Sequence, residues 1–406
     1  MSELTRREFI RHSALIAAGI PFISCDDKNP ESEIESPGQL LGNKQYKRII
    51  IIGAGLSGLV AGYELIRAGH DVTILEARNR IGGRVFTIRS PFSDGHFAEG
   101  GAARIPPDHD LTLGYAEYFG LALDHFYARS GSYVNLRNGK RTVISTDNFL
   151  NDRPWPGSAL HKEYVKLRDG SDTLPYAFFE SIADQIYLSI PVVSISQNTT
   201  GVVVRGTNGE KFEGDRALCT VPLPVLHRIN FSPSLSTEKE VAKSGGYRYA
   251  PSTRIYIQCK KRFWEAEGLN GWGNTDWPEE IWQPTWDREG PRGIIMSYLR
   301  WDRAEAMDML TEEKRITHVL DRWENIFPGV KDNIESGTSQ AWVLEKWSGG
   351  AWASPTADQD AALGDHIGRA EGRIHFAGEH ASNYHGWMQG ALSSGLRAAI
   401  EIHEKV

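Results

Sequence analysis

The residues best suited to chemistry in this 406-residue sequence form a glycine-rich turn, Gly53-Ala54-Gly55-Leu56-Ser57-Gly58. In a turn of this kind, Gly53 permits a tight bend, Gly55 lets the backbone approach a pyrophosphate, and Gly58 lets a helix pack closely on a strand. A helix that begins at the turn presents unpaired N–H groups, which favour an anion. The turn therefore predicts a site for a phosphate-bearing ligand.

The segments around the turn could position it. Residues 47–52 form a β-branched run typical of a strand buried on both faces, residues 59–68 predict a helix, and residues 72–76 predict a second strand. Glu76 ends that strand about 20 residues after the glycines, where a carboxylate accepts hydrogen bonds from an adenosine ribose. Because all these elements are in register, we expect a dinucleotide-binding domain.

Two further motifs indicate which dinucleotide is bound. Glu76 is followed by Ala77-Arg78-Asn79-Arg80-Ile81-Gly82-Gly83-Arg84, and a predicted strand near the C-terminus ends in Gly378-Glu379. The segment Gly386-Trp387-Met388 then precedes a predicted helix. Together with the glycine-rich turn, these motifs resemble those of the flavin amine oxidase superfamily, in the same order along the chain.

The resemblance implies a non-covalently bound FAD. It implies that Glu379 holds the ribityl chain, that the Met388 amide faces the flavin pyrimidine oxygens, and that the Val192 backbone meets the adenine. No cysteine lies between Gly378 and Trp387, so the covalent flavin link of monoamine oxidases is not expected. The residues expected to bind the cofactor are Gly53, Ala54, Gly55, Leu56, Ser57, Gly58, Glu76, Ala77, Arg78, Gly82, Gly83, Arg84, Gly101, Ala102, Ala103, Arg104, Val192, Gly378, Glu379, Gly386, Trp387 and Met388.

Other segments resemble secreted L-amino-acid oxidases more closely than monoamine or polyamine oxidases. Arg104 ends the segment Glu99-Gly100-Gly101-Ala102-Ala103-Arg104, where those enzymes carry an arginine that binds the substrate carboxylate. A guanidinium suits this role because its planar fork matches a carboxylate in two parallel hydrogen bonds. Tyr298 falls where the family has a tyrosine that donates to the same carboxylate. The alternatives are a surface or phosphate-side arginine and an ordinary core tyrosine.

The resemblance also implies the other groups around the substrate. Trp347 and Trp387 would form aromatic walls beside the flavin, and apolar walls favour the neutral form of the substrate amine. The Gly386 carbonyl would accept a hydrogen bond from the substrate nitrogen. Either tryptophan could instead be an ordinary core side chain.

Two features depart from the family pattern. Arg254 stands where family members place a lysine near flavin N5, and an arginine stays charged and cannot transfer a proton at working pH. A dehydrogenase that uses an acceptor other than oxygen is therefore an open alternative. Between Tyr133 and Gly170 the chain has room for a short connection in place of the helical insertion of the larger oxidases.

The motifs divide the chain into interleaved domains. We expect an α/β fold in which residues 46–101, 181–243 and 368–406 form a Rossmann-type FAD-binding domain. Residues 102–180 and 244–367 would form a substrate domain, built on an antiparallel or mixed sheet with helices and carrying the shortened helical insertion.

The first 45 residues resemble a targeting segment. The twin arginine Arg6-Arg7 precedes an apolar run, 13–24, that is too short for a membrane helix, and this resembles a bacterial Tat signal. Cys25 ends a sequence that resembles a lipoprotein cleavage site. We therefore expect export to the periplasm or secretion, with a membrane anchor at Cys25 as the alternative to a free protein. Residues 26–45 are expected to form a solvated tether.

Composition excludes several other classes of protein. With 45 Lys and Arg against 52 Asp and Glu, the net charge of −7 gives no basic surface for nucleic acid. Cys25, Cys219 and Cys259 lie far apart, so we expect neither a disulfide framework nor a metal site. A homo-oligomer is expected, although its size cannot be read from the sequence.

These observations predict FAD-dependent oxidative deamination of an L-amino acid. A hydride would pass from the substrate Cα to flavin N5, giving a 2-oxo acid, ammonia and, with oxygen as acceptor, hydrogen peroxide. The alternatives are a monoamine or polyamine oxidase, an isoprenoid or porphyrinogen-type dehydrogenase, an amine or amino-acid dehydrogenase with another acceptor, and a flavin-binding protein without turnover. The preferred substrate side chain cannot be read from the sequence.

Overall fold

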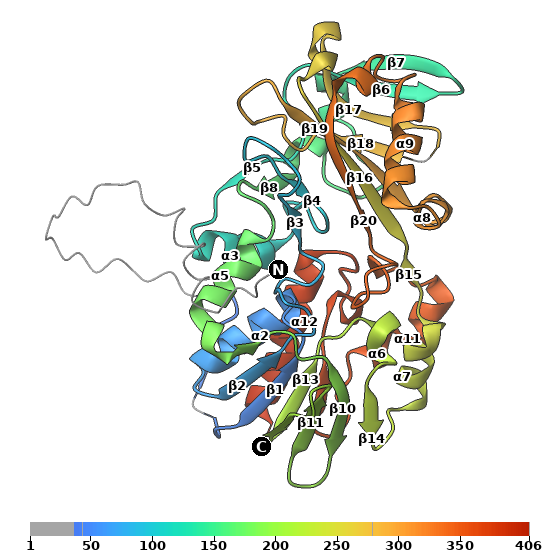
Figure 1. Ribbon diagram of the computed structural model, residues 1–406. Coiled ribbons are helices and arrows are strands. Elements are labelled where there is room, and N and C mark those ends of the chain that lie inside the picture. Colours follow the sequence, from blue (N-terminus) through green and yellow to red (C-terminus); the bar gives the residue numbers. More distant parts are fainter. Residues whose placement is uncertain (1–35, 43, 278, 406) are drawn as a thin grey trace, which may run out of the picture. The chain divides into compact units, whose positions relative to one another are not determined.

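A computed structural model of the protein describes residues 36–42, 44–277 and 279–405 (Figure 1). The predicted signal and residues 26–35 of the predicted tether lie outside the described residues. Among the helices that the structure describes, none combines the length and the apolar character needed to cross a membrane.

The glycine-rich turn belongs to a parallel sheet. Across the sheet its strands are β22 (Ile374–Phe376), β13 (Arg216–Cys219), β1 (Arg48–Ile52), β2 (Asp71–Leu75) and β9 (Ile186–Tyr187), and all neighbours run parallel. Because side chains alternate along a strand, Ile49 and Ile51 pack in one apolar cluster, and Ile50 and Ile52 pack in another. The β-branched run is therefore buried on both faces of the sheet, as predicted.

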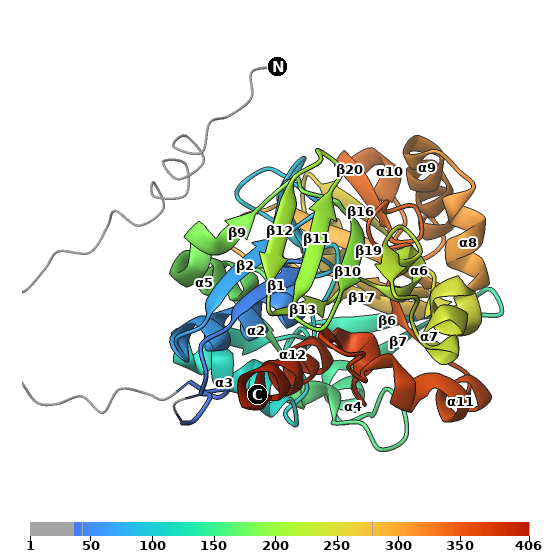
Figure 2. The same cartoon turned by 90° about the horizontal axis from the view of Figure 1, so that it is seen from below.

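Helices cover one face of this sheet and a second sheet covers the other (Figure 2). The helices are α2 (Leu56–Arg67), α3 (Asp110–Tyr118), α5 (Thr173–Ile182) and α12 (Met388–Glu404). The second sheet has the order β12 (Lys211–Gly214), β11 (Val202–Gly206), β10 (Val192–Gln197) and β14 (Asn230–Ser232). The carboxyl ends of β1, β2 and β13 lead into loops between these layers, where dinucleotides bind in open α/β sheets.

A larger mixed sheet lies beyond the parallel one (Figure 1). Its strand order is β20 (Ile334–Ala341), β16 (Ser252–Cys259), β19 (Gly293–Arg300), β18 (Glu279–Trp282), β17 (Leu269–Thr275), β6 (Ser132–Arg137) and β7 (Lys140–Ser145). β17 and β6 pair in parallel, and the other neighbours are antiparallel. One face packs on helices α8 (Asp302–Asp308), α9 (Glu312–Trp323) and α10 (Val330–Asn333). The opposite face carries Arg254 and Tyr298, so it is available to a site.

Short elements connect these layers. They are β3 (Thr87–Ile88), β4 (Ala98–Glu99), β5 (Leu123–His125), α4 (Thr146–Leu150), β8 (Val165–Leu167), α6 (Leu223–Leu226), α7 (Thr237–Val241), β15 (Tyr249–Ala250), β21 (Trp352–Ala353) and α11 (Ala357–Ile367). The α/β fold class with a Rossmann-type part and a mixed-sheet part is confirmed.

Side-chain caps fix where two of the helices begin. Helix α7 begins at Thr237, where the Ser236 hydroxyl accepts from the Lys239 N–H at 3.4 Å and caps the first turn. Helix α9 begins at Glu312, where the Thr311 side chain accepts from the Lys314 N–H.

The last part of the predicted tether is packed on the fold. Ser36 is 5% exposed and donates to Glu64 of α2. The Leu41 and Gly42 carbonyl oxygens lie 3.1 and 3.2 Å from Nε2 of His403 in α12. Residues 36–42 thus contact two helices at their ends, while Pro37, Gln39, Leu41 and Gly42 are exposed to solvent.

Candidate active site

The three glycines of the turn serve different purposes. Gly53 has a φ of +107°, a backbone conformation that residues with a side chain rarely adopt. A Cβ on Gly58 would overlap the Gly53 carbonyl oxygen, so a glycine there lets α2 pack on the strand. A Cβ on Gly55 would meet nothing within 4 Å, and Gly55 lines the main cavity. The space at Gly55 lets a phosphate approach the N-terminus of α2.

Glu76 is fixed beside this turn. Its side chain is buried, its Oε2 accepts from the Ala54 N–H at 2.8 Å, and its Oε1 accepts from the Arg78 N–H at 2.8 Å. Glu76 also lines the main cavity. A fixed acceptor at the end of β2 suits the ribose hydroxyls of a dinucleotide.

The main cavity has a volume of about 440 Å³ and is lined by residues from both the parallel and the mixed sheet. All residues predicted to bind the cofactor line it except Ala54 and Gly58, which are buried behind the turn. The predicted catalytic residues Arg104, Arg254, Tyr298, Trp347, Gly386 and Trp387 line it as well. Motifs far apart in the sequence therefore meet in one cavity.

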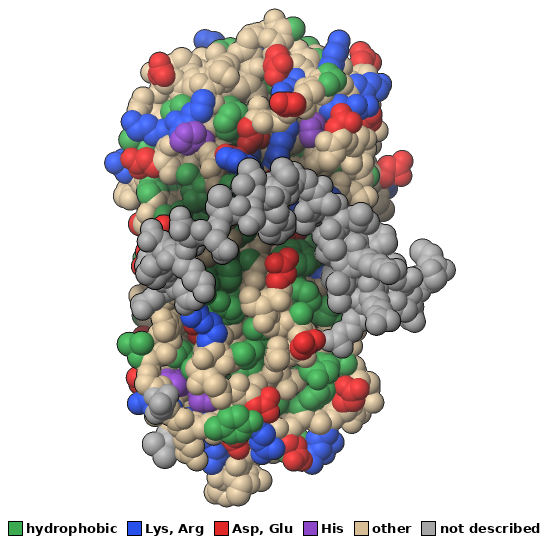
Figure 3. Space-filling view, turned by 90° about the vertical axis from the view of Figure 1, so that its left-hand side faces the viewer, with side chains coloured by type: hydrophobic (Ala, Val, Ile, Leu, Met, Phe, Trp, Pro, Cys, Tyr) green, Lys and Arg blue, Asp and Glu red, His purple; other side chains and the backbone are tan. Residues whose placement is uncertain are grey.

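On the face shown in Figure 3, hydrophobic side chains gather across the middle, between upper and lower parts that carry most of the visible charges.

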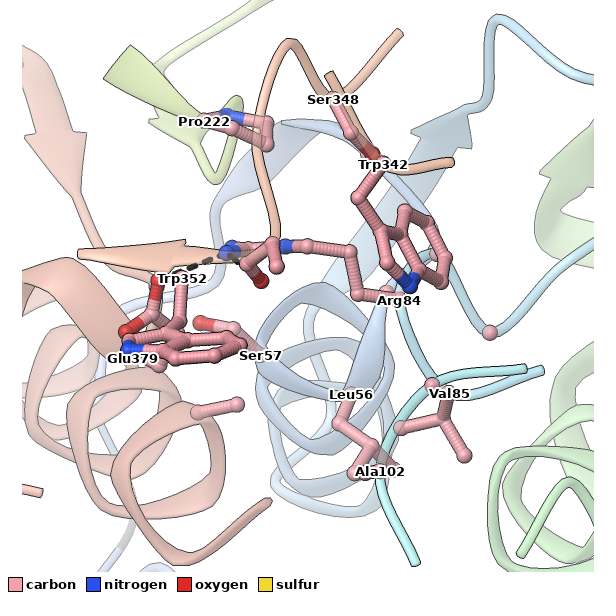
Figure 4. Close-up of a pocket in the computed structure, with 18 of the residues that line it drawn as sticks. Leu56, Ser57, Arg84, Val85, Ala102, Pro222, Trp342, Ser348, Trp352 and Glu379 are labelled. Carbon is pink, nitrogen blue, oxygen red and sulfur yellow. Dashed lines mark hydrogen bonds and ion pairs between the residues drawn. The ribbon is translucent and has the colours of Figure 1, made fainter. Parts of the chain in front are cut away.

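Arg84 and Glu379 form a buried ion pair in this cavity (Figure 4). Arg84 Nη1 lies 2.7 Å from Glu379 Oε1, and Glu379 Oε2 accepts from the Gly386 N–H at 2.7 Å. Burial raises the pKa of the Glu379 carboxyl, but Arg84 and the backbone donor outweigh burial and leave that pKa below its ordinary value. Glu379 therefore stays ionised and holds the Gly386 backbone in place.

The residues of the cavity fit FAD at three places. The Ser57 hydroxyl at the start of α2 is buried without a hydrogen-bond partner in the part of the chain that the structure describes, as expected for a group that meets a phosphate. Ile190 and Val192 give the cavity an apolar wall close to Glu76, where the Ile190 N–H donates to the Glu76 carbonyl at 2.9 Å. Met388 begins α12 and lines the cavity, so that a helix N-terminus can face the oxygens of a flavin ring.

Arg104 reaches the cavity from the loop after β4. Its Nη1 lies 3.4 Å from the Tyr127 hydroxyl and 3.6 Å from Glu280 Oε2. Glu280 also accepts from Arg300 Nη2 at 2.6 Å and from Trp282 Nε1 at 2.9 Å. Burial raises the pKa of Glu280, but Arg104 and Arg300 lower it below its ordinary value, so this carboxylate is ionised. Nη2 and Nε of Arg104 have no hydrogen-bond partner among the described residues and can bind a substrate carboxylate.

Tyr298 and Arg254 lie opposite each other on β19 and β16. The guanidinium carbon of Arg254 lies 4.3 Å from the centre of the Tyr298 ring. Arg254 Nη1 donates to the Glu99 carbonyl at 2.8 Å and to the Gly101 carbonyl at 2.6 Å. Arg254 therefore anchors the backbone that precedes Arg104, and it brings a permanent charge to the position where the family has a lysine.

Trp347 lines the main cavity beside Ser348. Its neighbour Ser348 accepts from Arg78 Nη2 at 3.0 Å, and Arg78 Nη1 in turn lies 3.8 Å from Glu76. Trp347 thus belongs to a segment that is tied through Arg78 to Glu76, and its place as a wall opposite Trp387 stays a prediction. The segment follows a turn after β20, in which the Gly349 N–H donates to the Glu345 carbonyl.

Trp342 also lines the cavity. Its Nε1 donates to the Gly100 carbonyl at 2.8 Å, and a Cβ on Gly101 would lie 3.3 Å from its ring. Trp342 therefore packs on the same loop that carries Arg104. Sequence reasoning missed this role, together with the cavity-lining residues Arg300, Trp352 and His385 and the Glu280 carboxylate that pairs with Arg104. The available signal was the alternation of side chains along β18 and β19. It places Glu280 and Trp282 of β18 on the same face as Tyr298 and Arg300 of β19.

Comparison with protein families agrees with this geometry. A family model described as "Flavin containing amine oxidoreductase" matches residues 56–160 and 155–403 of the chain. A model described as "Pyridine nucleotide-disulphide oxidoreductase" matches residues 13–94, which include the glycine-rich turn and Glu76. Both descriptions are those of dinucleotide-binding redox proteins, and with the cavity they indicate FAD as the cofactor.

Individual proteins are similar over most of the chain. YobN of Bacillus subtilis (strain 168), whose name assigns it provisionally to the L-amino-acid oxidases, is 30% identical over 90% of this chain and 96% of that protein. L-amino-acid oxidases of Pseudechis australis and Naja atra are each 26% identical, over 88% of this chain and 87% and 88% of those proteins. Putrescine oxidase bound to putrescine has a TM-score of 0.76 at 20% identity and covers 89% of this chain and 100% of that one. Cyclohexylamine oxidase from Brevibacterium oxydans IH-35A has a TM-score of 0.77 at 17% identity and covers 88% and 99%. The predicted resemblance and the fold are confirmed.

Proposed function

The chain belongs to the flavin-containing amine oxidoreductases, with FAD as its cofactor, and from this premise we propose that it oxidatively deaminates an L-amino acid. The free edge of the Arg104 guanidinium carries the proposal, because Arg104 lines the cavity and uses only Nη1 on described protein groups. A planar pair of N–H donors binds a carboxylate, a group that simple amines lack. The similarity to L-amino-acid oxidases supports the same substrate class.

The residues of this chain would position the substrate. Arg104 and Tyr298 bind the carboxylate, and the Gly386 carbonyl accepts from the substrate nitrogen while Glu379 holds the Gly386 N–H at 2.7 Å. When bound, FAD supplies the acceptor for a hydride from the substrate Cα. Trp342 and other aromatic side chains exclude water, which favours the neutral amine that hydride loss requires. The imino acid then hydrolyses to a 2-oxo acid and ammonia, and oxygen as electron acceptor gives hydrogen peroxide.

The test is flavin reduction in the absence of oxygen. The purified holoprotein is mixed with L-amino acids, D-amino acids and amines without a carboxylate, and the absorbance of oxidised flavin is followed. Reduction by L-amino acids alone is the expected result. Reduction by amines without a carboxylate would instead indicate a monoamine or polyamine oxidase, and no reduction by any of them would contradict both readings.

Arg254 favours a second candidate, an amino-acid dehydrogenase with an acceptor other than oxygen. Its guanidinium anchors two backbone carbonyls and offers no titratable amine to assist oxygen chemistry. The reduced protein is mixed with oxygen or with a quinone, and the return of oxidised flavin is timed. Faster return with oxygen supports the oxidase, and faster return with the quinone supports the dehydrogenase.

A further inference from the structure

His385 lies between the main cavity and a second, smaller cavity. The second cavity has a volume of about 310 Å³ and is lined by residues 352–357, Asp360 and His385. His385 and Trp352 line both cavities. Thr356 and Asp360 are exposed, so the second cavity lies at the surface. A titratable side chain therefore stands between the substrate cavity and solvent.

A hydrogen-bond chain leads outward from His385. The Tyr247 hydroxyl donates to Asp360 Oδ1 at 2.6 Å, and its oxygen lies 3.4 Å from His385 Nε2. Because the Tyr247 proton is directed at Asp360, the Tyr247 oxygen accepts from the His385 Nε2–H, which leaves Nδ1 as an acceptor. The hydrogen-bond chain therefore has a direction: a proton taken up at His385 Nδ1 can leave through Nε2.

The cavity needs a group that can take up a proton. Amino acids arrive as ammonium ions, whereas hydride loss requires the neutral amine. The carboxylates of Glu280 and Glu379 are held by guanidinium groups, and Arg104 and Arg254 stay protonated. These charged groups are therefore unsuited to accept the ammonium proton.

We propose that His385 accepts the proton of the substrate ammonium and passes it through Tyr247 and Asp360 to solvent. His385 directly precedes Gly386, whose carbonyl accepts from the substrate nitrogen in the function proposed above, and the inference rests on that function. An imidazole is the side chain best suited to exchange protons near neutral pH.

The transfer moves one proton and no electrons. An ammonium N–H bond breaks as an N–H bond forms at His385 Nδ1, and the Nε2 proton moves to the Tyr247 oxygen as the Tyr247 proton moves to Asp360. Asp360 then releases that proton to solvent. Burial, and next the hydrogen bond to Asp360, raise the pKa of Tyr247, so the phenol accepts one proton as it gives up another and does not ionise.

Charged and titratable groups face the hydrogen-bond chain of His385, Tyr247 and Asp360 from several elements. They are Tyr249 of β15, Asp360 of α11, the neighbouring Glu379 and His380, and Arg84. Arg84 neutralises Glu379, and burial lowers the pKa of His380 to about 4, which leaves it uncharged near neutral pH. Asp360 is therefore the anion that draws the proton outward.

The test is the pH dependence of anaerobic flavin reduction by an L-amino acid. Loss of a general base costs about 10²-fold or more, so the rate in His385→Gln should fall about 10²-fold at neutral pH. The remaining rate should rise about tenfold per pH unit, because the variant depends on amine that is already neutral in solution. Tyr247→Phe and Asp360→Asn should change the pH profile in the same sense with a smaller loss. Added imidazole should restore part of the rate of His385→Ala, since the missing ring leaves space between the cavities.

The control is His366→Gln, the same substitution on the helix that carries Asp360. The His366 side chain is 31% exposed and lies 4.0 Å from Glu238 at the surface, so the rate and the pH profile should stay unchanged. A second readout needs no turnover: nitrogen NMR of the resting protein should show His385 protonated at Nε2.

Equal pH profiles in the wild-type protein and His385→Gln would overturn the proposal, as would a lower rate with the same profile, which reports positioning alone. Wild-type profiles in both Tyr247→Phe and Asp360→Asn would overturn the path to the second cavity, and an Nδ1–H tautomer would overturn its direction. If His385→Gln loses its flavin, the Tyr247 and Asp360 variants decide the matter, because neither residue lines the main cavity. A wild-type protein that no amino acid or amine reduces defeats the proposed function itself, which separates the two failures.

Discussion

Arg104 uses one edge of its guanidinium on Glu280 and leaves the other edge to the cavity. Arg104→Met removes both edges, while Glu280 keeps Arg300 and Trp282 as partners. A hydrogen bond to a charged group contributes about 1.5–3 kcal/mol, so kcat/KM for an L-amino acid should fall about 10²-fold or more, chiefly through KM. Steady-state kinetics on protein that retains its flavin measure this. Arg104→Lys keeps the charge without the planar fork, so its kcat/KM should lie between those of the wild-type protein and Arg104→Met. Unchanged kinetics in Arg104→Met would place the carboxylate elsewhere.

Glu280 offsets part of the positive charge of Arg104 and Arg300. In Glu280→Gln, Arg104 and Arg300 lose their shared anion, although the amide oxygen can still accept a hydrogen bond. The surplus charge should strengthen inhibition by unreactive carboxylates such as acetate by about fivefold, equivalent to about 1 kcal/mol at a partly exposed site. Inhibition constants for both proteins test this. Glu265→Gln, at a side chain that is 60% exposed, should change nothing, and equal inhibition in Glu280→Gln would remove Glu280 from the substrate's surroundings.

The residues of the glycine-rich turn could be assigned from the sequence because their partners are close along the chain. Ala54 and Arg78 bind Glu76 through contacts that any strand-turn-helix-strand unit brings together. Glu280 could not be assigned in this way, because it meets Arg104 only through the pairing of distant strands. The places of Trp342 and Trp347 in the cavity wall likewise depend on where β20 ends and the chain turns, which no local pattern states.

At the scale of elements, the register of β16, β19 and β18 sets a row of polar side chains across the mixed sheet. Arg254 pairs with Tyr298, and Tyr298 pairs with Glu280, so the three side chains lie on one face of the sheet. A slip of one residue would direct Ile255 to this face and bury Arg254 among the apolar residues behind it. The sequence predicts a mixed or antiparallel sheet here, but strand order and register depend on pairings between segments that are far apart in the chain.

The contact of α2 with α12 depends on Gly395. A Cβ there would overlap the Ser57 carbonyl oxygen and lie 2.7 Å from Val60 Cγ1. Gly395→Ala should push the helices apart and lower the free energy of unfolding by about 1–3 kcal/mol. Flavin retention should also weaken, because the N-terminus of α2 and Met388 of α12 both line the cavity. Thermal unfolding and flavin content after gel filtration measure the two effects.

Ile400→Ala is the matched control on the same helix, at a side chain that is 44% exposed. It should leave the flavin content unchanged. Full flavin content in Gly395→Ala would show that the spacing of the two helices does not govern cofactor binding.

At the scale of the molecule, buried histidines make stability depend on pH. Burial lowers the pKa values of His70, His109 and His380 to about 4, against about 6.5 in an unfolded chain. As the pH falls from 6.5 toward 4, the unfolded chain binds protons that the folded chain does not, so the free energy of unfolding falls. Each histidine contributes at most about 1.4 kcal/mol per pH unit to this loss. Burial raises the pKa of Glu99 to about 7, so above pH 4.5 the folded chain takes up this proton before the unfolded chain and the free energy of unfolding rises as the pH falls. This single group offsets only part of the loss from the three histidines. Thermal unfolding should therefore move steeply to lower temperature between pH 6.5 and 4.5.

His70→Gln tests the origin of this slope. His70 Nε2 lies 2.9 Å from His403 Nδ1, and burial of the His70 imidazole disfavours its charged form. The variant should show a weaker dependence of the unfolding temperature on pH. His227→Gln, at an exposed histidine, should keep the wild-type slope. Equal slopes in all three proteins would assign the acid sensitivity to other groups.

The cofactor cavity is complete only when segments as distant as Gly53 and Met388 have come together. FAD therefore binds a chain that has already folded, and we propose that Arg6-Arg7 directs export of this folded holoprotein from the cytoplasm by a Tat-type route. Substituting both arginines by lysine keeps the charge and should retain the flavoprotein in the cytoplasm, as measured by flavin absorbance in cell fractions. Arg11→Lys, a matched change nearby, should export normally. Cys25→Ala should release a lipid-anchored protein from the membrane fraction, and export of the double-lysine variant at the wild-type level would contradict the signal.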